Sequence, residues 1–263
     1  MKFLTERFDN NYSLLEALNR PLNKIWAGTT PSTERMDADF HGANNFSEAL
    51  SLFENGDLDL AKKIQGIKLP QLNNEREKKQ RIFSPVGGSV CIPKFLASNP
   101  YCMRRAKKIR ISDKVLSLYY NASVSCAYSA EEVLAVNKKL LDMVNSLTLE
   151  GYSIQVYYLN FSQAYSGKTA YSFIYKLKSF QEAFNVARSA FVLGSPAMLR
   201  GIWFKYIEHC TYDLDSRFAY GYGRPYYPNK QELVKYGIIK QEDILVDFQK
   251  LKDAKQATDL LQE

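Results

Sequence analysis

A short polar turn follows one of the most apolar stretches of the sequence and places oxygen-bearing side chains at alternate positions. Residues 115–120 are apolar or aromatic except for Ser117, and Asn121, Ser123 and Ser125 come directly after them. Amide and hydroxyl oxygens can bind Mg²⁺, but such sites usually include one or two carboxylates. The turn has none, so a role in capping the next helix and binding the main chain of a partner is favoured over a metal site.

Two other segments have the residue types that bind nucleic acids. The first is a basic run, and its members are Arg104, Arg105, Lys107, Lys108 and Arg110. The second interleaves aromatic and basic residues, among them Arg217, Tyr220, Tyr222, Arg224 and Tyr226. Basic side chains neutralise phosphates and tyrosine rings stack on bases. Each segment also has a plainer interpretation: the run as a solvated turn that enters a strand, and the loop as core packing or a protein interface.

Catalytic chemistry has weaker support. Asp213 and Asp215 lie on one face of an extended segment and form a candidate metal pair for phosphodiester hydrolysis, but no third ligand is evident. His41 and His209 are the only histidines, and neither is near a Gly-x-Ser-x-Gly elbow. We expect His41 at the surface and His209 as an ordinary helix-end residue. The sequence leaves catalysis open and favours a chain without it.

Residues 113–159 predict the elements that position the polar turn. A buried strand over 115–120 is followed by a helix, which begins with a Ser129–Glu132 capping box, and by a second apolar strand over 152–159. Two buried strands joined by one amphipathic helix are typical of a parallel sheet. The expected fold is therefore a doubly wound, mostly parallel α/β sheet.

The remaining sequence predicts an extension before this sheet. Residues 1–80 contain short amphipathic helices and, from 68 to 81, a charged linker with no apolar period. We therefore expect a helical N-terminal extension and linker over 1–80 and an α/β domain over 81–263. A further strand is expected over 168–177, and a helix is expected to begin at Ser195-Pro196.

Composition limits the class of protein. The chain has 263 residues, is 46% hydrophobic and has a formal charge of +7, which favours acidic or phosphate-bearing partners without requiring them. Its four cysteines show no CxxC spacing, so reduced thiols are expected rather than a zinc site or disulfides. No stretch approaches the length of a membrane span, and charged residues near the start disfavour a signal peptide. These features predict a cytosolic protein that does not contact membranes.

The strand, the turn Asn121-Ala122-Ser123-Val124-Ser125 and the following helix resemble the cation site of von Willebrand factor A domains. In that family Asp-x-Ser-x-Ser follows the first strand and holds a divalent cation. Here Asn121 stands in place of the aspartate. The resemblance implies a von Willebrand A-like fold over roughly residues 110–250 with a degenerate site, where Mg²⁺ binding is weak or absent.

Four stretches resemble, in the same order, a family of uncharacterised proteins encoded by tailed phages and prophages. They are FSEALSLFENGD, VCIPKFLASNPYCMRR, GYSIQVYYL and GSPAMLRGIWFKYIE. Within the last, Gly194-Ser195-Pro196 and Leu199-Arg200-Gly201 differ from the His-Pro and Arg-Arg more usual in that family. This resemblance implies a viral origin and a location in the host cytoplasm or the virion, with no activity to transfer.

Three functions remain at this point. The leading one is a non-catalytic module that binds a phage or host protein at Asn121, Ser123 and Ser125. The second is a nucleic-acid-binding protein that uses the basic run and the Tyr/Arg loop. The third is a metal-dependent phosphoesterase. The sequence leaves the oligomeric state and the identity of the partner undetermined.

Overall fold

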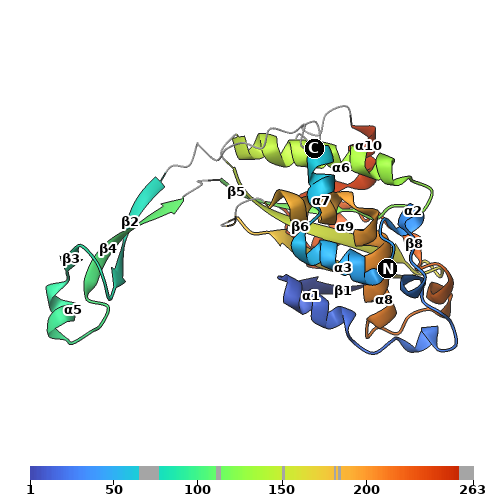
Figure 1. The fold of residues 1–263 in the computed structure, drawn as a ribbon, viewed down its shortest axis with the longest axis horizontal. Helices are drawn as coiled ribbons and strands as arrows, with labels where there is room; N and C mark the ends of the chain where they lie inside the picture. The colour runs from blue at the N-terminus through green and yellow to red at the C-terminus, as the bar shows by residue number, and fades with distance from the viewer. Residues whose placement is uncertain (65–76, 111–113, 150–151, 181, 183–184, 255–263) are drawn as a thin grey trace.

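A mixed α/β body contains most of the chain, as the computed structural model in Figure 1 shows. The structure describes residues 1–64, 77–110, 114–149, 152–180, 182 and 185–254. Its central sheet has the strand order β1-β7-β6-β5-β9, with β8 paired to β6 beyond the end of β5. The strands are β1 (Lys2–Phe8), β5 (Lys114–Asn121), β6 (Tyr152–Gln163), β7 (Thr169–Lys178), β8 (Arg224–Pro225) and β9 (Ile244–Asp247).

Most pairings in this sheet are parallel. Strands β9, β5 and β6 run in one direction, and β7 and β1 run in the other, so the two groups meet antiparallel at β6 and β7. The expected strand–helix–strand unit is confirmed, since β5 and β6 pair in parallel with Leu118 opposite Val156. Its helix, α6 (Ala130–Leu149), begins at the predicted capping box, where Ser129 and Glu132 exchange hydrogen bonds of 2.8 and 3.2 Å.

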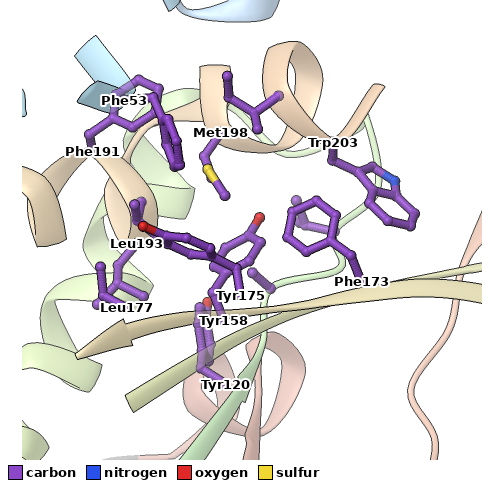
Figure 2. Packing of buried hydrophobic residues seen from close by; sticks show 14 of the residues in the cluster. Phe53, Tyr120, Tyr158, Phe173, Tyr175, Leu177, Phe191, Leu193, Met198 and Trp203 are labelled. Atoms are coloured by element: carbon purple, nitrogen blue, oxygen red, sulfur yellow. The ribbon is translucent and has the colours of Figure 1, made fainter. Parts of the chain in front are cut away.

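Helices cover both faces of the sheet. On the larger face, buried aromatic residues from β5, β6 and β7 pack against side chains from helices (Figure 2). The ring centroids of Trp203 and Tyr206 lie 5.1 and 5.3 Å from the ring centroid of Phe173. The other face is smaller, with Tyr119 stacked on Tyr157 and Leu233 buried above the sheet. Burial on both faces explains the nearly continuous apolar runs of β5 and β6.

The helical elements of the body occur in the following order. They are α1 (Asn11–Leu18), η1 (Lys24–Trp26), η2 (Ser32–Glu34), α2 (Ala38–His41), α3 (Phe46–Asn55), α4 (Leu58–Ile64), α6, α7 (Val186–Gly194), η3 (Met198–Trp203), α8 (Phe204–His209), η4 (Ser216–Tyr220), α9 (Lys230–Lys235) and α10 (Phe248–Asp253). The helix expected from Ser195-Pro196 is present and includes the π-helical stretch η3. Within the described residues, no helix combines the length and apolar character needed to cross a membrane.

The N-terminal segment differs from the expected helical extension. Residues 2–8 form β1, which pairs with β7 from Lys2 opposite Thr169 to Phe8 opposite Tyr175. Four of its seven residues are polar or charged, so the hydrophobic pattern did not indicate a strand. A strand at the edge of a sheet needs few apolar positions. The segment is therefore part of the central sheet, and the proposed division at residue 80 does not separate it from the α/β body.

A second, three-stranded antiparallel sheet projects away from the body (Figure 1). We call residues 77–110 the arm; it comprises β2 (Glu77–Ser84), β3 (Ser89–Val90), α5 (Ile92–Leu96) and β4 (Met103–Arg110). The boundary expected after residue 80 falls inside β2, and the basic run is a strand of the arm rather than a turn that enters β5. Part of the expected linker, residues 68–76, lies outside the described residues.

Candidate functional site

The polar turn at the carboxyl end of β5 faces inward. Asn121 and Ser123 are each 1% exposed. The Oδ1 of Asn121 accepts hydrogen bonds from the Ser123 amide at 3.2 Å and from the Ser123 hydroxyl at 2.7 Å. The Ser123 hydroxyl accepts another from the Phe161 amide, at 2.7 Å. Protein donors thus occupy both oxygens, and the turn joins the ends of β5 and β6.

The loop after β8 covers this turn. The Nδ2 of Asn121 donates to the Tyr226 carbonyl at 3.0 Å, and the Tyr226 hydroxyl donates to Glu232 at 2.8 Å. Burial and this carboxylate raise the pKa of Tyr226 to about 12, so the phenol stays protonated and keeps its bond. Ser125 is only half-buried, and its hydroxyl accepts from the Ala127 amide at 3.3 Å.

These contacts correct the expectation of a binding surface at Asn121, Ser123 and Ser125. Two of the three side chains are buried and committed to the fold, because a segment distant in sequence returns over them. Beside them the buried Nδ2 of Asn160 has no partner within the described residues. This group is a hydrogen-bond donor, so it disfavours a cation at this position. The turn stabilises the sheet edge and does not present ligands to solvent.

The two aspartates of the candidate metal pair are each bound to a separate cation. Asp213 lies 2.7 Å from the Lys24 ammonium, and Asp215 forms two bonds of 3.0 and 2.7 Å with the Arg217 guanidinium. These hydrogen bonds lower the pKa of both carboxyl groups. In the part of the chain that the structure describes, no three His, Cys, Asp or Glu side chains are grouped to hold a metal ion. The phosphoesterase hypothesis therefore gains no support from this region.

The Tyr/Arg loop contributes mostly to packing. Tyr222 is buried, its ring is stacked on Phe204 with 3.8 Å between centroids, and its hydroxyl donates to Glu208 at 2.6 Å. The expectation that Tyr222 offers a free face for bases is therefore wrong. Tyr220 is 83% exposed. Arg224 lies over the Tyr165 ring, 5.5 Å from its centroid. The alternation of aromatic and basic residues in the sequence did not reveal that the Tyr222 ring is buried. Tyr222 has a φ of 54°, which is unusual for a residue other than glycine.

A buried carboxylate joins this loop to the N-terminal segment. Glu208 accepts hydrogen bonds from the Thr33 amide at 3.3 Å, from the Thr33 hydroxyl and from Tyr222. Burial raises the pKa of Glu208. No local sequence pattern indicated this cluster, since Thr33 and Glu208 are distant along the chain. Its contacts are all with groups of the fold, which indicates a structural role.

A Ser–His–Asp group is present at Ser32, His41 and Asp37, although His41 was expected at the surface. His41 is buried, its Nε2 lies 2.9 Å from the Ser32 hydroxyl, and its Nδ1 lies 3.3 Å from the Asp37 carboxylate. However, the Asp37 amide also donates to Nδ1, at 3.2 Å. Nδ1 thus contacts both the carboxylate and the amide of Asp37, and Nε2 contacts Ser32. These contacts all lie within residues 32–41, so we interpret the group as one that holds this segment together.

The net positive charge of the chain comes from the arm. Residues 77–110 include nine Lys or Arg and one Glu, whereas the whole chain has 35 basic and 28 acidic residues. The arm thus has a formal charge of +8, and the other 229 residues sum to −1. Arg104 and Arg105 are exposed on β4. Lys107 and Lys108 follow on the same strand, opposite Gln80 and Lys79 of β2.

The far end of the arm is apolar. We call residues 83–102 the arm tip; seven of the exposed large hydrophobic side chains in the described residues lie here. They are Phe83, Val86, Val90, Ile92, Phe95, Leu96 and Tyr101. Monomeric proteins seldom expose so many apolar side chains together unless they meet a partner. The arm therefore combines an apolar tip with a basic stem, by which we mean residues 77–82 and 103–110.

The two halves of the expected nucleic-acid surface lie apart. Figure 1 shows the arm at one end of the molecule and β8, within the Tyr/Arg loop, towards the other. The basic run and the loop therefore do not form one continuous surface. Among the residues that the structure describes, the arm combines exposed charge at Arg104 and Arg105 with a projecting position, so it is the candidate functional site.

Comparison with known proteins gives a family and no function. No curated protein and no solved structure matches the chain. The family DUF7192, described as a domain of unknown function, matches residues 2–262 and so includes both the body and the arm. The chain therefore belongs to the DUF7192 family.

Proposed function

We propose that this chain is a non-catalytic nucleic-acid-binding protein that contacts phosphates through its arm. The observation that carries the proposal is the distribution of charge: +8 over 34 residues that project from the body, against −1 over the remainder. Lys and Arg that neutralise phosphates release condensed counterions, and this release supplies most of the free energy of non-specific binding.

The stability of the arm does not account for this charge. The β2–β4 register places Lys79 opposite Lys108, and like charges at facing positions of an antiparallel pair are destabilising. The single acidic residue of the arm, Glu77, is opposite Arg110 at the end of the pairing nearest the body. A polyanionic partner would relieve the repulsion along the stem.

The identity of the body belongs to the same proposal. The parallel β5–α6–β6 unit and the polar turn support a doubly wound, von Willebrand A-like fold, in which Asn121 and Ser123 have become structural. We extend the proposal to a phage or prophage origin and to action in the host cytoplasm or the virion, on the basis of the sequence resemblance alone.

Salt-dependent binding tests the proposal. The full chain is titrated into fluorescent duplex DNA, single-stranded DNA and duplex RNA between 50 and 200 mM salt, with Arg104→Gln/Arg105→Gln as the variant. Each lost phosphate contact is expected to lower the slope of log K against log salt by about 0.9. Lys138→Gln/Lys168→Gln, which removes two exposed charges from the body, is the matched control and is expected to retain the wild-type slope. Absence of binding at 50 mM salt, or equal slopes for both variants, would reject the proposal.

A further inference from the structure

The arm tip is a second binding element, distinct from the charged stem. We propose that it is an apolar wedge that enters duplex DNA at a base step and bends it; this inference rests on the proposed function. Proteins that insert apolar side chains between base pairs unstack the step and kink the duplex. Phe95 and Leu96, at 63% and 76% exposure, are the side chains best placed for this role.

The tip is an ordered platform rather than a loose loop. The Cys91 amide donates to the Cys102 carbonyl at 2.7 Å, which closes the segment that contains α5, and Pro93 lies in the first turn of that helix. The Lys94 ammonium lies 3.5 Å from the centre of the Phe83 ring. At Gly87 a side chain would collide with the carbonyl of Arg104, so glycine is required there. Side chains on such a frame lose little conformational entropy on insertion.

The position of charge along the stem favours a nucleic acid over an anionic membrane as the partner. Lys79 and Lys108 are five residues from the tip end of the β2–β4 pairing, or about 17 Å at 3.4 Å per residue. At physiological salt, attraction to a surface falls away over about 8 Å. Basic residues so far behind an inserted tip would contribute little at a flat membrane. They contribute fully when the stem follows a phosphate backbone.

The dimensions of the stem favour duplex DNA. Strands β2 and β4 pair over eight residues, which is about 27 Å of two-stranded ribbon. Two-stranded ribbons bind B-form DNA in the major or the minor groove, and apolar insertion between base steps is typical of minor-groove proteins, whereas duplex RNA is recognised mostly by its shape. With phosphates bound along the stem, the apolar tip is held against the base steps.

DNA bending tests the wedge. Fluorescence energy transfer is measured between dyes at the two ends of a DNA duplex while the whole chain is added. The variant is Phe95→Ser/Leu96→Ser, and the control is Tyr12→Ser/Leu58→Ser, which removes two similarly exposed apolar side chains from the body. The wild type and the control are expected to raise transfer efficiency at saturation. The tip variant is expected to bind DNA with an affinity of the same order and an unchanged salt slope, but to lose most of the rise in transfer.

Two outcomes would overturn the wedge. One is saturated binding by the wild type without any change in transfer, and the other is equal bending by the tip variant. Both leave phosphate binding by the stem intact, whereas absence of DNA binding would reject the proposed function itself. A parallel sedimentation assay uses vesicles of phosphatidylcholine with phosphatidylserine. Tip-dependent sedimentation in the absence of DNA bending would assign the tip to membranes and reject the wedge.

Discussion

The turn at the end of β5 buries polar groups, whereas the arm exposes apolar ones. In the turn, Asn121 and Ser123 are buried, and their oxygens are satisfied by donors of the protein. In the arm, large apolar side chains are exposed and basic residues accumulate with one acidic residue among them. A closed hydrogen-bond network stabilises the fold, whereas exposed apolar side chains and a net excess of basic residues gain favourable contacts when a partner binds.

The difference shows that the position of a motif does not decide its role. The carboxyl edge of a parallel sheet is where doubly wound folds usually bind ligands. Here a returning loop closes that edge with the Tyr226 carbonyl, and the projecting arm lies elsewhere. A position where related folds bind ligands is thus closed by the fold, while the projecting arm is the segment that we propose binds nucleic acid.

The largest expected effect comes from neutralising the stem. Replacement of Arg104, Arg105, Lys107 and Lys108 by Gln is expected to weaken binding to duplex DNA by about 100-fold or more at 0.1 M salt, because four phosphate contacts are lost. Because Arg104 and Arg105 are exposed, replacing them is expected to change the free energy of unfolding by less than about 0.5 kcal/mol per position. Fluorescence anisotropy and urea denaturation measure the two quantities. A large loss of stability with unchanged binding would reverse the roles assigned to arm and body.

Asn121→Asp restores the carboxylate of the resembled cation motif and tests whether the turn is closed. The new carboxylate faces the Tyr226 carbonyl without a proton to donate, so we expect a loss of about 3 kcal/mol or more in the free energy of unfolding. Thermal unfolding with and without 5 mM Mg²⁺ gives the measurement. Addition of Mg²⁺ is expected to leave the variant destabilised; recovery by Mg²⁺ would show a latent cation site.

Ser123→Ala tests the same network with a smaller change. The buried Phe161 amide loses its acceptor, and an unsatisfied buried donor costs about 1–3 kcal/mol. Urea denaturation should show this loss, with nucleic-acid affinity at the wild-type level. Ser125→Ala is the control, because Ser125 is only half-buried and its hydroxyl accepts a longer bond. Equal effects of the two substitutions would contradict a network centred on Ser123.

Glu208 makes the stability of the body depend on pH. Burial raises the pKa of Glu208, so the folded state holds its proton to higher pH than the unfolded state does. The stabilisation from this group is full below the ordinary carboxyl pKa, near 4.5, and is lost as pH rises through the raised folded pKa. Between pH 4 and 8, the wild type should lose stability relative to Glu208→Gln. A constant difference between the two proteins would contradict the raised pKa.

The smallest effect is expected at Tyr220. Since this side chain is largely exposed, Tyr220→Ala should change the free energy of unfolding by less than about 0.5 kcal/mol and leave DNA binding unchanged. Tyr222→Phe is its counterpart in the packed part of the loop; loss of the bond to Glu208 should cost about 1 kcal/mol. A marked loss of DNA affinity in Tyr220→Ala would return the loop to the binding surface.

The sequence predicted the local elements with strong patterns. Side chains on both faces of β5 and β6 are covered, so these strands do not alternate between apolar and polar residues. Their nearly continuous apolar runs indicated buried parallel strands. The Ser129–Glu132 box located the start of α6, since caps depend on neighbouring residues alone. The coarse α/β class followed from these local signals.

Long-range contacts explain what the sequence left hidden. Strand β1 is specified by its pairing with β7, more than 160 residues away, and burial of Asn121 depends on the Tyr226 loop. The strand β4 has basic residues where most strands alternate, so hydrophobic periodicity did not detect it. At the candidate site, the sequence identified Arg104 to Lys108 as basic but gave no signal that they project from the body on a ribbon with an apolar tip.

The way the arm joins the chain has a further consequence. Glu77 and Arg110, its first and last residues, are direct neighbours across the β2–β4 pair. A segment that leaves and returns at one point can be exchanged for a short turn without lengthening the path between α4 and β5. Members of one family can thus diversify this appendage independently of the scaffold, and engineers can transplant it onto an unrelated hairpin.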